Sequence, residues 1–474
     1  MSVPGFSKSP GQEFVIIGAG PTGLSAAYWL ARCGHAVTVL EASSAVGGLA
    51  ASFEVGGVRV DHGSHRLHFA VDPRDLTVLR EWLGSELQSR TRNGRIFLRG
   101  QWFRFPPRPG ELLRRLPPAA VWASSLGRLA GRRRGRPASF EDEALVRTGE
   151  FIWKNVYRPY ALKLWGRLGG ELSPTLARQR VSTRGTVDLL RKMIPLRAHG
   201  HRFFYPAGGF GRICEALAEA AASLGAEIVT DARVTSIRTE PRLAVQYVDG
   251  RSGAERRVGA CMVVSTLPQR SLVELLDLRP PRQVEEALGR LRHRGMVLVY
   301  VALSGRPWTN FDAHYVPDNA FLASRISEPI NYRSSPHDPA DRTVVCFEVP
   351  CDPGDAVWDG SSEELVGRIA ADVVDLGLPS IAGRLEEVVV RKLSHVYPVQ
   401  YVGFEDDQWM IETWLASLPG LVQVGRQPFF SGDNTHHCLA MGRSLAEAID
   451  ADGRLDKDRW RSCRHSFLSH VVED

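Results

Sequence analysis

The chain of 474 residues lacks several features that would point to a class of protein directly. It contains no apolar run of about 18 residues or more, so a transmembrane helix is not expected. Its seven cysteines are scattered and form no CxxC pair, which argues against a disulfide framework and against a zinc site. Residues 1–12 show no basic segment followed by an apolar one, and we therefore expect a cytoplasmic protein.

Acidic residues are scarce between residues 99 and 136, where ten arginines carry much of the formal net charge of +6. Such a segment suits an acidic partner, a membrane surface or an anionic substrate, but a solvated surface insertion is the simpler interpretation. Aromatic residues do not alternate with these arginines, so no nucleic-acid partner is expected. Membrane-surface contact is the weaker alternative.

The strongest motif lies near the start of the chain. An apolar strand is expected at residues 14–17, followed by Gly18-Ala19-Gly20-Pro21-Thr22-Gly23 and a helix from Leu24. Gly18 suits a tight turn, Gly20 lets backbone amides approach a pyrophosphate, and Gly23 permits close packing of the helix on the strand. Because helix N-termini attract anions, this strand–turn–helix unit predicts a dinucleotide-binding site.

Two further features refine the ligand. A second strand is expected at residues 36–40, and Glu41 at its end can accept hydrogen bonds from an adenosine ribose. The pair Gly47-Gly48 follows shortly after, where backbone can pass close to a ligand a second time. This doublet resembles the one in flavoproteins that bind FAD in an extended form, so FAD is the predicted cofactor.

The arrangement of strand and helix patterns predicts two domains of different class. An apolar run at residues 261–266 is typical of a parallel strand that is covered on both faces, whereas strands at 297–302 and 344–349 suggest an antiparallel sheet. We expect an α/β, Rossmann-like FAD-binding domain that is discontinuous, joined to an α+β substrate domain of antiparallel sheet and helices. The predicted boundaries are 12–70, 200–268 and 418–452 for the FAD-binding domain, 71–199 and 269–417 for the substrate domain, and 453–474 for a peripheral C-terminal helix.

Three more motifs follow in order along the chain. They are Tyr205-Pro206-Ala207-Gly208-Gly209, Val264-Ser265-Thr266-Leu267-Pro268, and Gly425-Arg426 before a polar turn and helix. With the N-terminal motif, they resemble a superfamily of FAD proteins that contains amine oxidases, protoporphyrinogen oxidase, UDP-galactopyranose mutase and carotenoid-type desaturases. The resemblance implies that the last helix closes over the flavin. The candidate cofactor-binding residues are therefore Gly18, Gly20, Gly23, Glu41, Gly47, Gly48, His65, Val234, Gly425, Arg426, Asn434 and Thr435.

Some local patterns are most similar to UDP-galactopyranose mutase. Gly63-Ser64-His65-Arg66-Leu67-His68 resembles its GxHxxH segment, and residues 324–328 resemble the segment that supplies an arginine to the substrate diphosphate. By this resemblance His65 would adjoin the flavin, Arg325 would bind an anion, and Arg426 would polarise the flavin. Arginine suits both latter roles because its charge is permanent and its donors form a planar fork.

Each candidate also has a structural interpretation. His65 and His68 either flank the flavin, where an imidazole can move a proton, or only hold a loop in place. His436 and His437 begin the last helix, and no third ligand with suitable spacing accompanies them, so no metal is predicted. Arg325 either binds an anionic substrate or pairs with Glu328. The candidate catalytic residues are His65, His68, Arg325 and His437.

The leading functional hypothesis is a FAD-dependent oxidoreductase that transfers a hydride to the flavin from a polar small molecule, anionic or sugar-like. The first alternative is a redox-neutral isomerase that resembles UDP-galactopyranose mutase. The stretch after Gly425-Arg426 reads Gln427-Pro428-Phe429-Phe430, where the mutase carries tyrosines, and this difference favours the oxidoreductase. The second alternative is a non-catalytic flavoprotein of a biosynthetic complex. The sequence leaves the substrate, the electron acceptor and the oligomeric state open.

Overall fold

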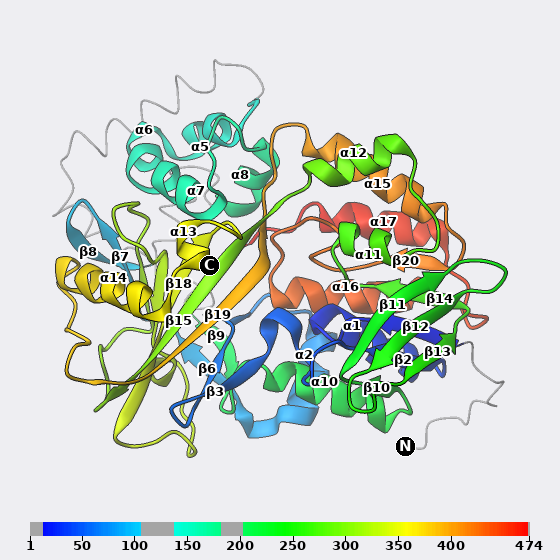
Figure 1. The fold of residues 1–474 in the computed structure, drawn as a ribbon, viewed down its shortest axis with the longest axis horizontal. Helices are drawn as coiled ribbons and strands as arrows, with labels where there is room; N and C mark the ends of the chain where they lie inside the picture. Colours follow the sequence, from blue (N-terminus) through cyan, green and yellow to red (C-terminus); the bar gives the residue numbers. More distant parts are fainter. Residues whose placement is uncertain (1–12, 106–136, 182–201, 473–474) are drawn as a thin grey trace.

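The structure, a computed structural model, describes residues 13–105, 137–181 and 202–472 (Figure 1). Its five-stranded sheet is parallel throughout and has the order β10-β2-β1-β14-β20. These strands come from three distant parts of the sequence, which confirms a discontinuous α/β domain. Their bounds are Glu13–Ile17 (β1), Ala36–Leu40 (β2), Glu227–Val229 (β10), Met262–Ser265 (β14) and Leu421–Gln423 (β20).

The two faces of this sheet are covered differently, because successive side chains of a strand point to opposite faces. Phe14 and Ile16 pack on a cluster to which helices α1, α2, α10 and α16 contribute. Val15 and Ile17 pack instead on the three-stranded sheet β11-β12-β13 and on helices α11, α12 and α15. The bounds are Pro21–Arg32 (α1), Pro73–Leu83 (α2), Arg212–Ser223 (α10), Thr435–Glu447 (α16), Ala232–Arg238 (β11), Ala244–Asp249 (β12), Glu255–Gly259 (β13), Gln269–Leu275 (α11), Arg282–Arg290 (α12) and Phe404–Ala416 (α15).

A seven-stranded sheet forms the centre of the other half, in the order β19-β15-β18-β17-β16-β7-β8. All its neighbouring strands are antiparallel except β16 and β7. This arrangement confirms the predicted antiparallel sheet of the second domain, in which β7 and β8 form a hairpin. The bounds are Gly94–Leu98 (β7), Gln101–Phe105 (β8), His293–Ser304 (β15), Ala313–Tyr315 (β16), Arg325–Ser327 (β17), Arg342–Cys351 (β18) and Leu385–Pro398 (β19).

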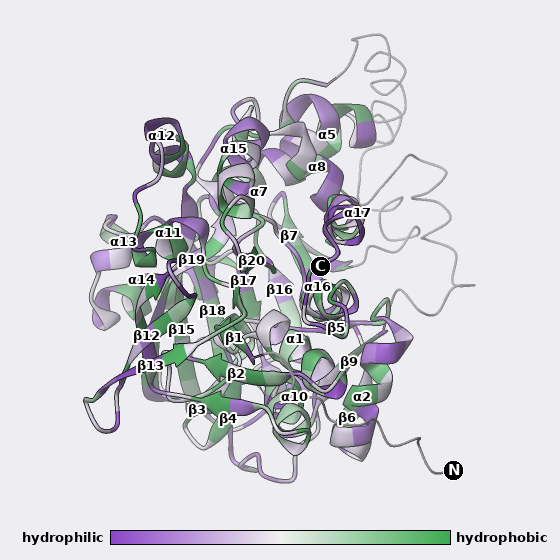
Figure 2. Cartoon of the chain, turned by 90° about the vertical axis from the view of Figure 1, so that its right-hand side faces the viewer, coloured by the Kyte–Doolittle hydropathy of each residue, from purple (hydrophilic) through white to green (hydrophobic). Residues whose placement is uncertain are grey.

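Strand β15 shows why this sheet is buried on both faces. Val297, Val299 and Val301 pack against helix α14 (Ser362–Asp375), whereas Leu298 and Tyr300 pack against the hairpin of β3 (Ser52–Val55) and β4 (Val58–Asp61). The hairpin directly follows the glycine pair in the sequence, so it ties the two halves of the molecule together. Figure 2 shows the central strands as largely hydrophobic and many helices with hydrophilic outer surfaces.

A group of helices lies above the seven-stranded sheet in Figure 1 and has its own apolar cluster, centred on Phe140, Trp153 and Trp165. Its main helices are α5 (Phe140–Thr148), α7 (Arg158–Trp165) and α8 (Pro174–Arg180), with α6 (Glu150–Ile152) between the first two. Most of the arginine-rich segment, residues 106–136, lies outside the described residues. A small sheet of β5 (Leu67–His68), β9 (Arg202–Pro206) and β6 (Leu87–Thr91) and the helices α13 (Ala356–Asp359) and α17 (Lys457–Phe467) complete the described fold.

The helix at 457–467 lies within the region predicted as a peripheral C-terminal helix. Among the described residues, no helix has both the length and the apolar character needed to cross a membrane. The exact domain boundaries stay a prediction.

Candidate cofactor site and substrate pocket

The glycine turn between β1 and α1 has the geometry that the sequence predicts. Gly18 adopts a φ of 100°, and a Cβ atom there would lie 2.2 Å from Oγ1 of Thr266. A Cβ atom on Gly23 would lie 2.0 Å from the carbonyl oxygen of Gly18, so only glycine permits this close packing. Gly20 faces open space, and no side chain caps the N-terminus of α1. Backbone N–H donors are therefore left for an anion.

Glu41 and the glycine pair border this turn. The Glu41 carboxylate accepts hydrogen bonds from the backbone N–H groups of Ala19 (2.8 Å) and Ser43 (2.9 Å). A carboxylate has about four acceptor positions, so it can still accept from ribose hydroxyls. The N–H of Gly47 donates to the carbonyl of Ala19 over 2.8 Å, and Gly47 has a φ of 121°. The backbone thus returns to the turn as expected, with Gly48 beside Gly20.

The C-terminal part of the chain closes on the same turn. A Cβ atom on Gly442 would lie 2.4 Å from the carbonyl oxygen of Thr22, so α16 lies directly on α1. A Cβ atom on Gly425 would lie 3.0 Å from Oγ1 of Thr22. Asn434 is the N-cap of α16 and Thr435 is its first residue. The Gly425 turn and the middle of α16 therefore both pack against the start of α1, beside the glycine turn.

Val234 belongs to β11, whose first residue Ala232 donates its N–H to the carbonyl of Glu41 over 2.8 Å. The strand therefore begins next to the expected adenosine end of the site. Free N–H donors at the start of α1, a carboxylate with spare acceptors and glycines at the close approaches fit an extended dinucleotide. Gly18, Gly20, Gly23, Glu41, Gly47 and Gly48 would hold its adenosine diphosphate part.

Arg426 follows the glycine at the end of this site. Its guanidinium donates to the carbonyl oxygens of Val396 (2.5 Å) and Asp433 (3.3 Å), while its buried Nε has no hydrogen-bond partner in the described structure. Burial and the neighbouring Arg180 lower the pKa of Arg426. A buried cation with an unused donor is suited to a ligand that carries or gains negative charge.

The structure places Arg325 in an ion pair that the sequence did not predict. Its Nε and Nη2 donate to the carboxylate of Glu348 over 2.9 and 2.8 Å, and Nη2 also donates to the carbonyl of Ser64. The alternative pairing with Glu328 is wrong, because Glu328 accepts from Trp308, Thr309, Asn331 and Thr343 instead. Arg325 therefore has its charge balanced within the protein and holds the loop that carries His65.

His65 stacks on Phe210 with ring centroids 5.2 Å apart. Burial and the charge of Arg325 lower the pKa of His65 to about 4, so its imidazole is neutral at neutral pH. A neutral imidazole can accept a proton or contact a flavin ring. Its contact with the cofactor stays a prediction.

Four histidines form a row at the N-terminus of α16. His68 stacks on His436 at 5.4 Å, His436 contacts His437 at 3.9 Å, and His437 stacks on His470 at 4.1 Å. The Asp433 carboxylate lies 3.2 Å from Nδ1 of His437 and 2.7 Å from Nδ1 of His470. Burial alone would raise the pKa of Asp433, but hydrogen bonds from His437 and His470 hold that pKa below its usual value.

Asp433, His437 and His470 bring three donor atoms within 4.8 Å of one another, a grouping that sequence spacing did not reveal. However, the rings of His437 and His470 are parallel to within 9° and are stacked. Because the nitrogen lone pairs lie in the ring planes, two stacked rings do not point at one ion. The geometry instead fits one carboxylate that accepts hydrogen bonds from two imidazoles.

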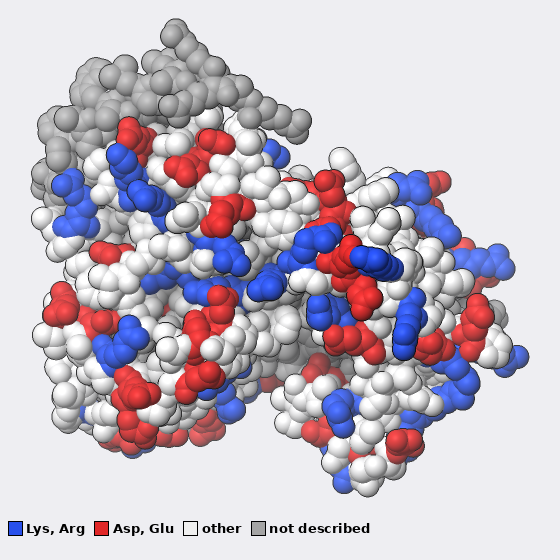
Figure 3. All heavy atoms as spheres, turned by 45° about the horizontal axis from the view of Figure 1, so that its top comes forward, with Lys and Arg blue, Asp and Glu red and all other residues white. Residues whose placement is uncertain are grey.

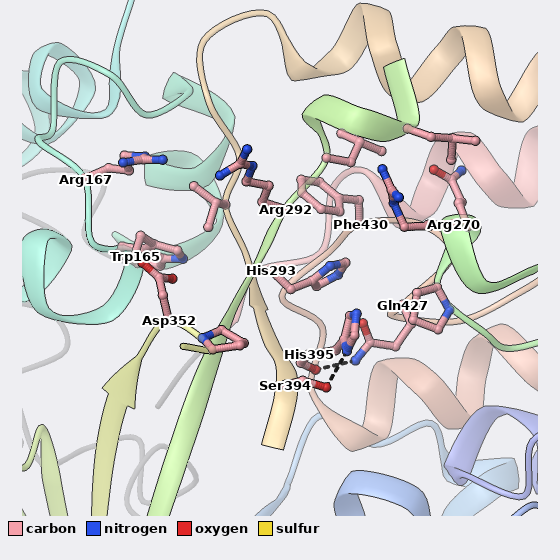
Figure 4. Close-up of a pocket in the computed structure, with 16 residues that line it drawn as sticks. Trp165, Arg167, Arg270, Arg292, His293, Asp352, Ser394, His395, Gln427 and Phe430 are labelled. Atoms are coloured by element: carbon pink, nitrogen blue, oxygen red, sulfur yellow. Dashed lines mark hydrogen bonds between the residues drawn. The ribbon is translucent and has the colours of Figure 1, made fainter. Parts of the chain in front are cut away.

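A cavity of about 450 Å³ adjoins the Gly425-Arg426 turn (Figure 4). Gln427 donates to the carbonyl of His395 over 2.7 Å, and Ser394 Oγ lies 2.7 Å from Nδ1 of His395. Burial lowers the pKa of His395, and burial with nearby His395 lowers the pKa of His293 to about 3. The lining comes from six separate segments and is formed by Trp165, Arg167, Pro268, Gln269, Arg270, Leu288, Leu291, Arg292, His293, Asp352, Pro353, Ser394, His395, Val399, Gln427 and Phe430.

Sequence reasoning identified none of the cavity's arginines as site residues. Arg270 follows the recognised Val264–Pro268 motif, and that proximity was the one available signal. Arg167 and Arg292 belong to no motif. They meet only because the helical group and β15 lie side by side in the fold.

The parallel sheet, the glycine turn and the closing helix define a FAD-dependent flavoprotein of two domains. The sequence profile of the family described as flavin containing amine oxidoreductase matches residues 21–450, and the chain belongs to that family. The chain is therefore a flavin-dependent enzyme, and FAD is its cofactor. The non-catalytic alternative is not retained.

The curated relatives that match include L-amino-acid oxidases of snakes. The protein from Bothrops jararacussu is 24% identical over 345 residues, which cover 66% of this chain and 65% of the relative. The protein from Daboia russelii is 32% identical over 193 residues, which cover 39% of this chain and 34% of the relative. The chain thus matches somewhat less than two thirds of the length of the first relative and about one third of the second.

Solved structures show the same fold. A reduced UDP-galactopyranose mutase superposes with a TM-score of 0.78 at 19% identity, covering 98% of this chain and 100% of the mutase. Cyclohexylamine oxidase from Brevibacterium oxydans superposes with a TM-score of 0.66 at 15% identity, covering 93% and 98%. At these identities the likeness establishes the fold alone.

Proposed function

We propose that the enzyme is a FAD-dependent oxidoreductase that removes a hydride from a polar, anionic small molecule. The observation that carries this proposal is the cavity of about 450 Å³ beside the Gly425-Arg426 turn, with basic side chains at one end. Such a volume lies within the usual range for small-molecule sites. When bound, FAD supplies the hydride acceptor, and the protein orients the substrate.

The chain's own residues have distinct roles in this proposal. Arg426 stabilises negative charge that develops at the end of the cofactor, because its buried cation is fixed in place by two carbonyl groups. His395 accepts the proton that the substrate's N–H or O–H group loses, since its imidazole is uncharged and is oriented through Nδ1 by Ser394. His65, His68 and His437 remain candidates for contact with the cofactor.

The relatives suggest which compounds to test first. The curated matches are L-amino-acid oxidases, whose substrates carry a carboxylate next to an oxidisable C–N bond. A carboxylate suits the arginine end of the cavity, so α-amino acids and α-hydroxy acids form the first panel. Polyamines, which are cationic, form the opposing panel.

Anaerobic mixing tests the proposal. A true substrate is expected to bleach the oxidised flavin absorbance in a single turnover, and anionic compounds should do so faster than cationic ones. Replacement of His395 by Gln should slow this reduction by about 10²-fold, the usual contribution of a general base. The proposal fails if no compound of either panel reduces the flavin of the holoprotein.

A redox-neutral isomerase is the second candidate. It is favoured by the likeness to UDP-galactopyranose mutase over nearly the whole of both chains. Against it, Phe429 and Phe430 provide no hydroxyl after the Gly-Arg turn, and Phe429 is packed against Phe467 of α17. Conversion of a nucleotide sugar that requires prior reduction of the flavin, with no net oxidation, would establish the isomerase instead.

A further inference from the structure

Every second residue from 290 to 294, where α12 leads into β15, is an arginine. Only the first and the last of these three form an ion pair with a carboxylate of the described residues. Arg290 donates to Asp407 through Nε and Nη2 over 2.8 and 2.5 Å, and Arg294 reaches Asp352 over 2.5 Å. Arg292 lies between them, lines the cavity and has no ion-pair partner within residues 13–105, 137–181 and 202–472. Its exposed guanidinium is thus unbalanced in a region where neighbouring arginines are paired.

Arg167 shares this property. It follows α7, lines the same cavity and has no ion pair in the described part of the chain. A second hollow, of about 260 Å³, is also lined by Arg167, Arg292 and Val399. The two arginines therefore stand at the junction of two hollows.

The close-up shows how the cavity is divided. Arg167, Arg292 and Arg270 are spread from left to right across the upper part of the view, whereas Ser394, His395 and Gln427 lie below them (Figure 4). Arg270, by contrast, forms a long and exposed ion pair with Glu274, at 3.8 Å. On the surface, basic side chains gather across the hollowed middle of the face shown in Figure 3.

Unpaired cations around one cavity repel one another, and an anion removes that cost. One planar guanidinium can donate two parallel hydrogen bonds to the oxygens of a carboxylate or phosphate, whereas a lysine ammonium offers no such planar pair of donors. Exposed arginines are often merely solvated. Here, however, Arg167 and Arg292 come from different segments and border the same hollows, next to the apolar rings of Trp165 and Phe430.

We propose that Arg167 and Arg292, assisted by Arg270, bind a carboxylate or phosphate group of the substrate. The oxidisable end of the substrate then points toward Ser394, His395 and Gln427, which adjoin the Gly425-Arg426 turn. This inference rests on the proposed function, and it names the anionic group as the feature by which substrates are selected.

Calorimetric titration of the FAD-loaded protein with succinate and with pyrophosphate tests the inference without turnover. At least one of them should bind saturably, and its identity distinguishes a carboxylate site from a phosphate site. R167A and R292A should each weaken that binding by about tenfold or more, the loss of a charge-assisted contact. R292K should restore part of it, and rising salt should weaken it.

Arg282 provides the matched control, because it is an exposed arginine of α12 that pairs with Glu286 and does not line the cavity. R282A removes the same charge and should leave the affinity unchanged. The inference is overturned if neither anion binds saturably, or if R282A weakens binding as much as R167A and R292A do. FAD content and thermal unfolding confirm that the variants are folded.

The outcomes separate this inference from the oxidoreductase proposal. Binding through Arg167 and Arg292 without reduction of the flavin by any compound would keep the anion site and defeat the oxidoreductase. Reduction of the flavin with the same KM in R167A, R292A and the unmodified protein would keep the oxidoreductase and defeat the anion site.

Discussion

The two halves of the molecule hold their ligand-facing groups in different ways. Around the parallel sheet, the predicted cofactor site is built from backbone, since Gly18, Gly20 and Gly23 shape the turn and N–H groups would be its donors. Beside the antiparallel sheet, the cavity is built from side chains of six separate segments. A backbone site tolerates almost no change in residue type, whereas a side-chain site can change its specificity while the fold stays the same.

This difference explains what the sequence could predict. The glycine turn, Glu41 and the glycine pair lie within about 30 residues of one another, and their spacing follows from one strand–turn–helix unit. The cofactor was therefore predictable from local spacing, whereas the approach of the Gly425-Arg426 turn to this site was expected only from the family resemblance.

The side-chain half was not predictable, for a physical reason. Arg325 is separated from Glu348 by only 23 residues, but their pairing depends on the register of β17 with β18. Asp433 and His470 likewise meet because α17 returns the chain to the start of α16. Sheet register and helix docking are decided by packing over the whole domain, which local patterns do not encode.

The largest effect should come from a change in the backbone-built half. Gly23→Val places a side chain 2.0 Å from the carbonyl oxygen of Gly18, so we expect loss of FAD and failure to fold stably. Gly20→Ala is the matched control, because its Cβ meets no protein atom within 4 Å. This control should fold but bind FAD more weakly. Flavin absorbance measures the FAD content of each variant, and thermal unfolding measures its stability. Equal FAD content and equal stability of the two variants would contradict the idea that close backbone packing at Gly23 shapes the site.

In the side-chain half, removal of Glu348 should be nearly as damaging to stability. Glu348→Ala leaves the partly buried Arg325 without its counter-charge and removes a buried acceptor, and we expect a loss of about 3 kcal/mol in the free energy of unfolding. Glu286→Ala removes the exposed partner of Arg282 and should cost at most about 1 kcal/mol. Urea unfolding measures the difference. Similar losses for the two variants would show that the Arg325–Glu348 pair contributes no more to stability than an exposed ion pair does.

The border between the halves is tested at Arg426. Arg426→Lys keeps the positive charge but loses the planar set of donors, so the rate of flavin reduction should fall by about 10–100-fold. Stopped-flow reduction by the best substrate measures this rate. FAD content serves as the control, and an unchanged rate at full FAD content would remove Arg426 from the reaction.

The smallest effect concerns pH. Burial, with neighbouring histidines, lowers the pKa of His436 to about 3 in the folded chain, whereas an unfolded histidine has a pKa of about 6.5. Below about pH 6.5 the unfolded chain therefore binds a proton at this position that the folded chain does not. The free energy of unfolding should fall by about 1–2 kcal/mol between pH 6.5 and 5 for this reason. His436→Phe should remove this share of the pH dependence, because Nδ1 of His436 makes no hydrogen bond to any residue that the structure describes. Urea midpoints at the two pH values give the comparison, and an identical pH slope in the variant would refute it.

The order of strands in the parallel sheet also has a consequence for synthesis of the protein. Strand β14 has β1 on one side and β20 on the other, and β20 begins only at Leu421. Until the ribosome has released that residue, the apolar edge of β14 lacks its neighbour and is open to pairing with other nascent chains. The protein should therefore depend on chaperones late in translation.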